Sequence, residues 1–401
     1  MGVRNKTQLA VGLDAGCSRT RCVICAIEDG RLRFLGYGET ASAGWIKGRI
    51  SDTVALSESM RVAIREAERS AQQLVDSCVA GMGGTTVQSG YARAVYEFGH
   101  AREIQQDDVT YVIDQAARVR LEADRMLLHV FPRDFVLDGR AGYRNPRRST
   151  CARLEANVLA VTASSHEHDS LVDAIHQAHL AVEETVFEPI AAAYAAIIPQ
   201  DRARGVAVID LGMHSTDIVI FDGDALMLAA PLPVWSDHMT RDVAWVLKCP
   251  YEDAEGMKKE YGSANAAATA ENSYVQLPPA EGRAPREVSR KELNEIIEAR
   301  AVEMFRYAKA EISKAGMDQS LLEGVVLCGG GSMLNGICDV AEDIIGCSSR
   351  NGLAVGIKDW PEELDNPVWT TAAGLAMYSA RLKFRVQTKR RAPGLVGMVR
   401  G

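Results

Sequence analysis

The stretch VIDLGMHSTD (residues 208–217) is an apolar run that ends at Asp210 and passes through one glycine, Gly212, to a hydroxyl pair. Strand, Asp, Gly and then Ser or Thr is how a loop that holds ATP phosphates by backbone N–H groups is built. Met213 and His214 occupy positions where such a loop normally carries further glycines. The stretch therefore indicates a working nucleotide site, a damaged one or a chance match.

The same pattern occurs in the first half of the chain. Residues 9–39 and 205–231 each contain an apolar strand that ends at Asp-x-Gly, a turn with Ser or Thr, a second apolar strand, an Asp-Gly hairpin turn and a third strand. Asp-Gly between β-rich runs is a strong local hairpin signal. Two equivalent hairpins indicate duplicated α/β domains that face each other across a cleft. The matching positions are Asp14 and Asp210, Gly16 and Gly212, Ser18 with Thr20 and Ser215 with Thr216, and the hairpin turns at 29–30 and 222–223.

These two turns together predict a phosphate-binding cleft. Each turn presents backbone N–H groups to the cleft, and its hydroxyls add donors to phosphate oxygens. Asp14 and Asp210 would then converge where Mg²⁺ and its waters bridge the β- and γ-phosphates. The alternative is that both Asp-Gly pairs merely end strands.

Two further motifs suit the same cleft. The apolar run that begins GVVLC (324–328) leads into Gly329, Gly330 and Gly331, which would let a flat ring lie close to the backbone. Glu188 precedes a proline and a helix of small residues, so its carboxylate would sit at the positive end of that helix. A carboxylate near the γ-phosphate could orient a hydrolytic water.

The composition is that of an ordinary globular protein. The chain has 401 residues, 47% of them hydrophobic and 24% charged, which is long enough for two core-bearing domains. A net charge of −8 argues against a general nucleic-acid binder, which would carry a basic stripe. The N-terminal stretch has no signal-peptide pattern, and the most apolar stretch, 189–198, is about half the length that a membrane span needs. We expect a soluble, intracellular protein with no nucleic-acid partner.

Cysteine and histidine spacings give little support to a metal site. Nine cysteines in such a chain are expected to be reduced thiols. Cys22 and Cys25 lie in RCVICAI, which predicts a strand, so their sulfurs would point to opposite faces. His176 and His179 fit one face of a helix, but no Cys or carboxylate spacing completes a known site. We expect solvated histidines there.

The order of the motifs resembles the superfamily of actin, heat-shock chaperone and sugar-kinase ATPases. DAGCSR resembles its first phosphate loop, DLGMHSTD its second, and VVLCGGGS its adenosine motif. Within this superfamily the chain resembles the FtsA family of actin-like bacterial division proteins over nearly its whole length. The segments that carry this resemblance are 36–52, 126–158, 186–195, 232–247, 253–264 and 290–305.

The resemblance implies an α/β fold with two actin-like (ribonuclease H-like) domains around a nucleotide cleft. A small SHS2-like domain would be inserted in the first half, with Asp107 and Asp108 at the start of its helix. A second insertion in the other half would line the adenosine side, and its polar, Pro- and Gly-rich stretch 273–289 predicts an exposed loop. The implied domains are 1–83 plus 163–203, the inserted domain 84–162, 204–232 plus 321–385, the second insertion 233–320, and a basic tail 386–401.

The resemblance also implies an ATP and Mg²⁺ site. Glu255 and Lys258 would lie on a helix at the adenosine end of the cleft. The catalytic candidates are Glu188 and Asp210, and Asp14 with Asp210 would hold Mg²⁺. The predicted nucleotide-binding residues are Asp14, Gly16, Cys17, Ser18, Arg19, Gly212, Met213, His214, Ser215, Thr216, Glu255, Lys258, Gly329, Gly330, Gly331 and Ser332.

FtsA proteins tether FtsZ filaments to the cytoplasmic face of the membrane at the division site and recruit later division proteins. They also form actin-like filaments, and the resemblance implies these partners here, with the inserted domain as the recruiting surface. By the same resemblance the FtsZ C-terminal peptide would dock around 285–312, where basic residues flank an apolar helix. A buried helix face with solvated ends would look similar. The predicted docking residues are Arg286, Arg290, Lys291, Asn294, Ile297 and Arg300.

Three departures from the family pattern bear on hydrolysis. Met213 and His214 reduce the glycine content of the second phosphate loop, which would remove N–H donors to the transition state, although His214 could donate in their place. Trp235-Ser236 replaces a Gly-Gly pair in a loop that approaches the nucleotide. Arg19 replaces a lysine but keeps the charge of the first loop, so this departure is expected to be harmless. We therefore predict that the chain binds ATP·Mg²⁺ and hydrolyses it slowly or not at all.

The C-terminal segment leaves two interpretations open. Residues 381–401 carry seven basic residues and no acid, which favours an anionic membrane surface. Pro393 and two glycines interrupt the apolar positions, so a stable amphipathic helix is not expected. Direct membrane binding and a disordered tail both fit.

Three rival functions remain open. They are a superfamily ATPase, a kinase, and a pilus-assembly actin homologue without FtsZ binding. A kinase would need an Asp base at an acceptor pocket and intact phosphate glycines, and we find no clear candidate for that base.

Overall fold

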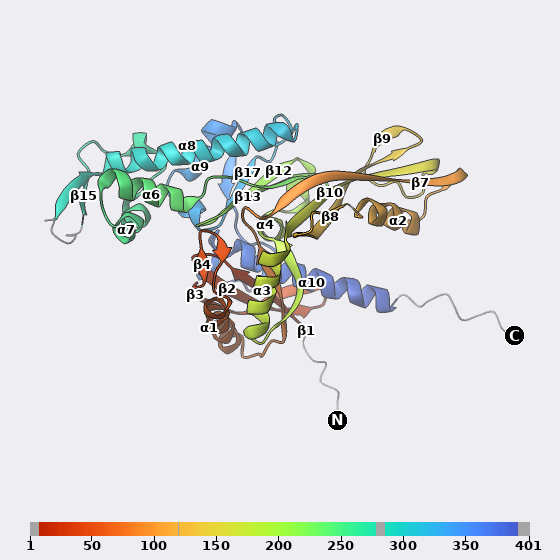
Figure 1. The fold of residues 1–401 in the computed structure, drawn as a ribbon, viewed down its shortest axis with the longest axis horizontal. Helices are drawn as coiled ribbons and strands as arrows, with labels where there is room; N and C mark the ends of the chain where they lie inside the picture. Colours follow the sequence, from red (N-terminus) through yellow and green to blue (C-terminus); the bar gives the residue numbers. More distant parts are fainter. Residues whose placement is uncertain (1–7, 119, 278–284, 392–401) are drawn as a thin grey trace, which may run out of the picture.

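The computed structural model describes residues 8–118, 120–277 and 285–391. Within these ranges the chain forms two lobes, an inserted domain and a second insertion (Figure 1). In Figure 1 the inserted domain and the second insertion extend to opposite sides of the lobes. None of the described helices is long and apolar enough to cross a membrane.

The first lobe is built on a six-stranded sheet. Its hydrogen-bonded order is β11-β6-β1-β2-β3-β19. The first three strands of the chain pair antiparallel, as the Asp-Gly hairpin predicts, and β1, β6 and β11 run parallel. The strands are β1 (Gln8–Ala15), β2 (Arg19–Glu28), β3 (Arg31–Ala41), β6 (Ser77–Met82), β11 (Ala181–Phe187) and β19 (Ile357–Lys358).

The second lobe repeats this arrangement with five strands in the order β14-β13-β12-β17-β18. Its first three strands are again an antiparallel meander, and β17 pairs parallel with β12. The duplicated α/β fold predicted from the two hairpins is confirmed. The strands are β12 (Val206–Leu211), β13 (Thr216–Asp222), β14 (Ala225–Pro231), β17 (Val325–Cys328) and β18 (Ser349–Asn351).

Helices cover both sheets, and two of them join the lobes. Helix α4 begins at Glu188, with proline in its first turn where a missing N–H is harmless, and α10 packs against it closely enough that only glycine fits at Gly374. The lobe helices are α1 (Thr53–Ala71), α3 (Ser165–Gln177), α4 (Glu188–Ala196), α5 (Pro199–Ala203), α9 (Ile337–Ile345) and α10 (Thr370–Arg391). Short elements are β4 (Trp45–Ile46), β5 (Arg49–Ile50), η2 (Gly330–Met333) and η3 (Glu362–Leu364).

The inserted domain is a four-stranded antiparallel sheet with one helix. The strand order is β7-β10-β8-β9, and α2 covers one face of the sheet. Two acidic residues lie in the first turn of α2, as predicted, where their negative charges interact favourably with the positive end of the helix. The elements are β7 (Gln88–Glu103), α2 (Gln106–Ala116), β8 (Arg125–Leu137), β9 (Arg140–Tyr143) and β10 (Thr150–Ser164).

The second insertion is mainly helical. The prediction of an exposed loop at 273–289 is wrong at both ends, because residues there pair as the antiparallel strands β15 and β16. The part between them, 278–284, lies outside the described residues. The elements are α6 (Ser236–Leu247), α7 (Tyr251–Tyr261), η1 (Ala266–Ala268), β15 (Tyr274–Leu277), β16 (Arg286–Ser289) and α8 (Arg290–Lys314).

The structure gives the positions of the cysteines and histidines that the sequence analysis considered as metal ligands. Cys22 and Cys25 are fully buried in two different hydrophobic clusters, so the prediction of opposite strand faces is confirmed. His176 is in the last turn of α3, but His179 lies beyond the end of that helix at a positive φ of 68°. The two histidines therefore do not share a helix face, but both side chains are exposed, so the expectation of solvated histidines is confirmed.

The predicted basic tail begins inside a helix. Helix α10 continues to Arg391, so the backbone of residues 386–391 is helical, whereas the sequence favours either a membrane-binding or a disordered segment there. The rest of the tail, 392–401, lies outside the described residues.

Candidate nucleotide site

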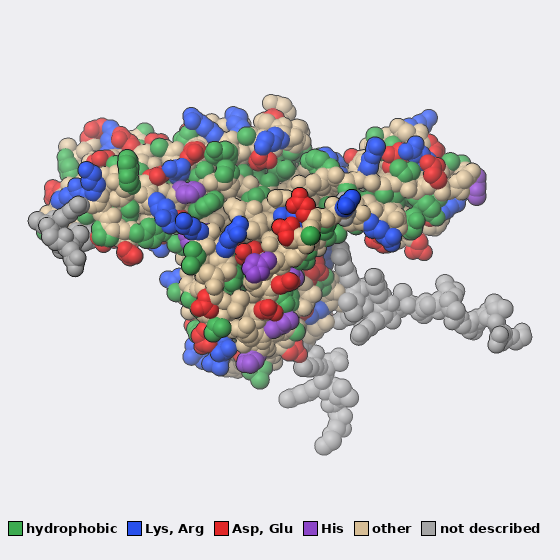
Figure 2. Space-filling model, viewed as in Figure 1, with side chains coloured by type: hydrophobic (Ala, Val, Ile, Leu, Met, Phe, Trp, Pro, Cys, Tyr) green, Lys and Arg blue, Asp and Glu red, His purple; other side chains and the backbone are tan. Residues whose placement is uncertain are grey.

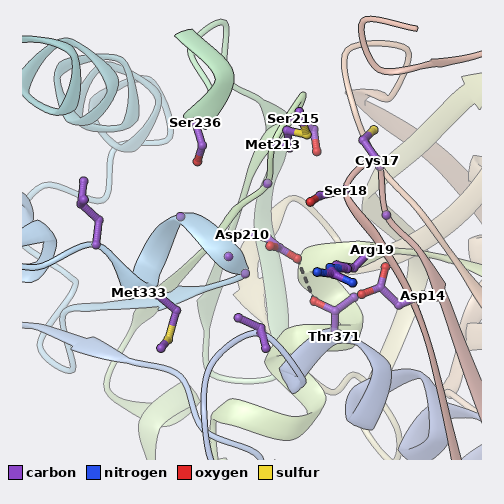
Figure 3. Close-up of a pocket in the computed structure, with 18 of the residues that line it drawn as sticks. Asp14, Cys17, Ser18, Arg19, Asp210, Met213, Ser215, Ser236, Met333 and Thr371 are labelled. Atoms are coloured by element: carbon purple, nitrogen blue, oxygen red, sulfur yellow. Dashed lines mark hydrogen bonds between the residues drawn. The ribbon is translucent and has the colours of Figure 1, made fainter. Parts of the chain in front are cut away.

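Loops from both lobes and the second insertion enclose a cavity of about 350 Å³. Figure 3 shows Asp14 from the first lobe and Asp210 from the second lobe facing this shared space. Most of the predicted nucleotide residues line it. These lining residues are Asp14, Gly16, Cys17, Ser18, Arg19, Glu188, Asp210, Gly212, Met213, Ser215, Glu255, Lys258, Gly329, Gly330 and Gly331.

Three predicted residues are absent from this lining. Thr216 is buried beneath the loop, with its hydroxyl 3.9 Å from the sulfur of Met304. The hydroxyl of Ser332 donates to the carbonyl of Gly329 at 2.7 Å. The ring of His214 faces a carboxylate in α6, Asp237, with 3.8 Å between Nε2 and Oδ2. The idea that His214 replaces a lost phosphate donor is therefore not supported by this geometry.

The second phosphate loop closes on itself through backbone contacts. The N–H of Gly212 donates to the carbonyl of Ser215 at 2.8 Å, and a side chain at Gly212 would crowd that oxygen. Met213 lines the cavity, whereas glycine there would leave the backbone open to a phosphate. The prediction that Trp235 intrudes as well is wrong. Its ring stacks on His238 at 4.2 Å between centroids, and Ser236 lines the cavity instead.

Acidic side chains gather at the base of the cavity, where the two lobes meet. Asp210 accepts a hydrogen bond from the hydroxyl of Thr371 at 2.8 Å, as Figure 3 shows. Burial raises the pKa of Asp14 to about 7 and the pKa of Asp210 above its usual range. Burial also raises the pKa of Glu188, well above the ordinary value, and the nearby aspartates add to the shift. A cation bound beside these carboxyls would favour their charged forms.

A fourth acid, Asp217, is not singled out by the sequence analysis although it lies in the opening stretch. Its Oδ2 accepts from the backbone N–H of Gly84 at 3.1 Å. Its Oδ1 is buried with no hydrogen-bond partner among the described residues. Burial raises its pKa to about 7. An acid inside an apolar strand is a signal that could have identified it. Asp217 itself does not line the cavity. The lining residues that the sequence did not single out for nucleotide binding include Arg21, Gly83, Gly84, Ser236, Asn335 and Thr371.

The acids fit a hydrated Mg²⁺ rather than an ion bound by protein alone. Within the described ranges no three acidic, cysteine or histidine side chains group closely enough to hold a metal ion by themselves. Mg²⁺ is usually bound by one or two carboxylates together with waters and substrate phosphates. Asp14 and Asp210 are placed to hold such an ion, which would neutralise charge on the β- and γ-phosphates.

The other end of the cavity carries a partly buried ion pair. Lys258 lies 2.7 Å from the carboxylate of Glu255, and its ammonium also donates to the hydroxyl of Thr240 at 2.7 Å. The three glycines lie opposite, and a side chain at Gly331 would collide with Ser236 and Leu211. A polar pair facing a glycine-lined wall suits the hydroxyls and flat ring of a nucleoside.

The raised pKa values predict a pH dependence of stability. Asp14 and Asp217 have folded pKa values of about 7 against an ordinary 3.8, so folding takes up protons between these values. Through these two groups the stability of the nucleotide-free chain should rise by about 1.5 kcal/mol as the pH falls from about 8 to about 6.5. Below that, neutral His129, with a pKa lowered to about 4 by burial, opposes the trend.

Thermal unfolding across this pH range measures the effect. Mg²⁺ with nucleotide should flatten the trend because a cation stabilises the ionised acids, and Asp217→Asn should reduce it. If the melting temperature became lower as the pH was lowered from about 8 to about 6.5, the assignment of raised pKa values would be contradicted.

The predicted peptide-docking residues all contact other residues of the same chain. Ile297 is fully buried, and buried Asn294 bonds the N–H of Ser263 and the hydroxyl of Thr269, so neither can contact a docked peptide. For these two the prediction is wrong, because the face that they occupy is core. Arg300 pairs with Asp242 and Glu303. The remaining contacts are Arg286 to the carbonyl of Leu247, Arg290 to the carbonyl of Tyr261, and Lys291 to Glu271.

The two duplicated lobes around one acidic, glycine-lined cavity define an actin-like ATPase fold. Solved structures agree. A chain of a PilM–PilN type IV pilus biogenesis complex aligns over 92% of this chain and 98% of its own length, with a TM-score of 0.68 and 17% identity. MreB5 of Spiroplasma citri bound to ADP aligns over 95% and 99%, with a TM-score of 0.57 and 12% identity.

Sequence comparison gives the family. The model for cell division protein FtsA matches residues 207–374, and the model for the SHS2 domain inserted in FtsA matches 84–162. Cell division protein FtsA of Borreliella burgdorferi is 33% identical over 92% of this chain and 90% of its own. The Pseudomonas aeruginosa FtsA is 31% identical over 92% and 89%, and that of Escherichia coli K12 is 27% identical over 97% and 95%. The chain belongs to the FtsA family of cell division proteins.

Proposed function

We propose that the chain is an ATP-binding tether that links FtsZ filaments to the cytoplasmic face of the membrane at the division site. The observation that carries this is the cavity itself, in which Asp14 and Asp210 from two duplicated lobes face one glycine-lined space. Membership of the FtsA family supports this role. The chain acts as an adaptor whose shape depends on the bound nucleotide.

In this proposal ATP binds with Mg²⁺ and is hydrolysed slowly or not at all. Transition-state stabilisation in phosphoryl transfer depends on donors placed around the phosphate. Met213 in the second loop leaves fewer open backbone donors than glycine would. Glu188 is partly buried in the cavity wall, and burial raises its pKa, which disfavours the ionised form that accepts a proton from water while no cation is bound.

The FtsZ peptide docks on the exposed part of the second insertion in this proposal. Arg286 is exposed. Lys291 and Arg300 are partly exposed, so their surface ion pairs can open to accept an acidic peptide at small cost. Tyr307, 42% exposed on the same helix, offers an apolar contact. The buried residues Asn294 and Ile297 are excluded from the docking surface and support it from below.

Later division proteins are proposed to dock at the inserted domain. A cavity of about 1660 Å³ lies between α2 and α10, lined by Thr110 and Asp114 on one side and Lys383 on the other. The pilus protein in the solved PilM–PilN complex has the same fold and takes a partner. The proposal also includes self-association of the chain into filaments.

The C-terminal segment is proposed to add membrane affinity. Helix α10 continues the fold as far as Arg391 and so leads directly into the last residues of the chain. Basic residues near an anionic leaflet contribute about 1 kcal/mol each. Co-sedimentation with anionic liposomes, with and without residues 386–401, measures this contribution. Equal binding by the two forms would remove the segment from the proposal.

Binding of an FtsZ C-terminal peptide tests the adaptor role. We expect the full chain to bind a fluorescent peptide, and Lys291→Glu or Arg300→Glu to weaken binding about tenfold, because each reversal repels an acidic ligand. Arg140→Glu is the matched control, since this exposed arginine lies on the inserted domain. No binding by the unaltered chain would overturn the tether and favour a pilus-assembly homologue or a superfamily ATPase.

A further inference from the structure

A short β-hairpin of the first lobe reaches the nucleotide cavity. Its strands β4 and β5 pair antiparallel, and Figure 1 shows β4 rising from the first lobe towards the second. Lys47 and Gly48 form the turn at positive φ values of 49° and 77°, as a tight type I′ hairpin turn requires. Trp45, at the start of the hairpin, and Gly48, in its turn, both line the cavity.

The hairpin meets both phosphate loops. Just before it, the backbone N–H of Ser42 donates to the carbonyl of Ser18 in the first loop at 3.1 Å. Its turn abuts the second loop, because a Cβ added at Gly48 would lie 3.0 Å from the carbonyl oxygen of His214. The hairpin therefore belongs to one lobe, touches the other, and bridges them at the phosphate end of the cavity.

The surroundings of the hairpin favour an anion. Lys47 and Arg49 are exposed on it, and in Figure 2 lysine and arginine side chains gather on the surface where the hairpin meets the second lobe. Met213 leaves the second loop with fewer open backbone donors than glycine would. A phosphate held here thus has positive charge nearby and room for one more hydrogen-bond donor.

Trp45 carries such a donor. Its ring packs against a hydrophobic core cluster and lines the cavity. Its indole N–H is buried and has no hydrogen-bond partner among the described residues. An indole nitrogen can only donate, and a buried indole N–H is normally paired. The nucleotide-free arrangement therefore leaves a costly unpaired donor beside the space where phosphate oxygens would lie.

We propose that Trp45 is a phosphate-binding residue, whose indole turns when the cavity fills and donates from Nε1 to the terminal phosphate of ATP or to a water held on it. This inference rests on the nucleotide site of the function proposed above. The terminal phosphate is the acceptor because the hairpin contacts the second loop, whose Asp210 is placed to hold the ion between the β- and γ-phosphates. ADP lacks this phosphate, so Trp45 distinguishes the two nucleotides and closes the hairpin on ATP only.

Calorimetric titration of the full chain with nucleotide and Mg²⁺ tests the donor. Trp45→Phe keeps an aromatic ring against the core cluster but removes the N–H. Its affinity for ATP should fall about tenfold, the worth of one charge-assisted hydrogen bond, whereas its affinity for ADP should change little. Trp245→Phe is the matched control, since this tryptophan is 82% exposed on α6 and does not line the cavity.

A pair of glycine variants tests the hairpin independently of whether phenylalanine fits at position 45. Gly48→Ala pushes the turn away from His214 and should weaken ATP binding more than ADP binding. Gly30→Ala shares the backbone strain, with a φ of 80°, but has nothing within 4 Å of the added Cβ and lies outside the cavity lining. Equal affinities of G48A and G30A for ATP would contradict a closing hairpin.

Fluorescence reports on the ring itself. The chain has five tryptophans, and the difference in emission between the unaltered chain and W45F isolates the contribution of Trp45. This difference should change when ATP with Mg²⁺ is added and stay nearly constant with ADP.

The outcomes separate this inference from the function on which it rests. If the unaltered chain binds ATP and W45F binds it equally well, or loses ATP and ADP to the same extent, the role of Trp45 at the terminal phosphate is wrong while the nucleotide site stands. If the unaltered chain binds neither nucleotide, the ATP site of the proposed function is overturned and this inference with it.

Discussion

Replacing Gly374 with alanine should cost about 3 kcal/mol of stability or more, the largest effect of any single methyl group that we expect in this chain. Gly374 lies in α10 where that helix crosses α4 between the lobes. A Cβ at this position would lie closer than 3.0 Å to the carbonyl of Ala191, a distance that real Cβ atoms essentially never reach. The obstacle is backbone, so no rotamer change relieves it and the two helices must separate.

Chemical denaturation of the full chain measures the loss. The matched control is Gly256→Ala in α7, where nothing lies within 4 Å of the added Cβ and the position is exposed. Alanine there should stabilise the chain by about 0.5–1 kcal/mol, since glycine is a poor helix residue. If both variants were equally stable, α4 and α10 would not pack as closely as the structure shows.

Local patterns predicted the phosphate loops and the lobe fold, because each depends on contacts within a short segment. Asp14 and Asp210 end strands whose partners follow directly in the chain, so periodicity and Asp-Gly turns were enough. Thr371, which donates to Asp210, lies 161 residues away in sequence. No local signal connects the two, and only the folded chain brings them together.

Side-chain direction was the other limit of the sequence. Trp235 in a loop beside the nucleotide predicted a blocked site, but stacking on His238 turns the ring aside. Asn294 and Ile297 fit an exposed docking helix and a buried one equally well by spacing alone. Burial against the rest of the second insertion decides between these interpretations, and it makes both residues core.

Replacing Asp210 with asparagine should separate nucleotide binding from stability. Asparagine keeps the shape and still accepts from Thr371, so the local hydrogen bond of 2.8 Å survives. It removes one charge from a buried acidic group whose pKa is raised. We expect the nucleotide-free variant to be as stable as the unaltered chain or more stable, whereas affinity for ATP with Mg²⁺ should fall about 10–100-fold, as for other lost metal-orienting groups.

Calorimetric titration with ATP in Mg²⁺ and again in EDTA distinguishes the causes. If D210N binds ATP with Mg²⁺ more weakly because it no longer holds the ion, its affinity for ATP without Mg²⁺ should change little or rise. The reason is that a carboxylate near the phosphates repels them when no metal is present. Asp222→Asn is the control, since this acid ends the neighbouring strand β13 but pairs with Arg144 at the surface. Equal affinity of D210N and the unaltered chain for ATP with Mg²⁺ would show that Asp210 takes no part in holding the ion. Equal losses with and without Mg²⁺ would point to a distorted loop instead of a missing ligand.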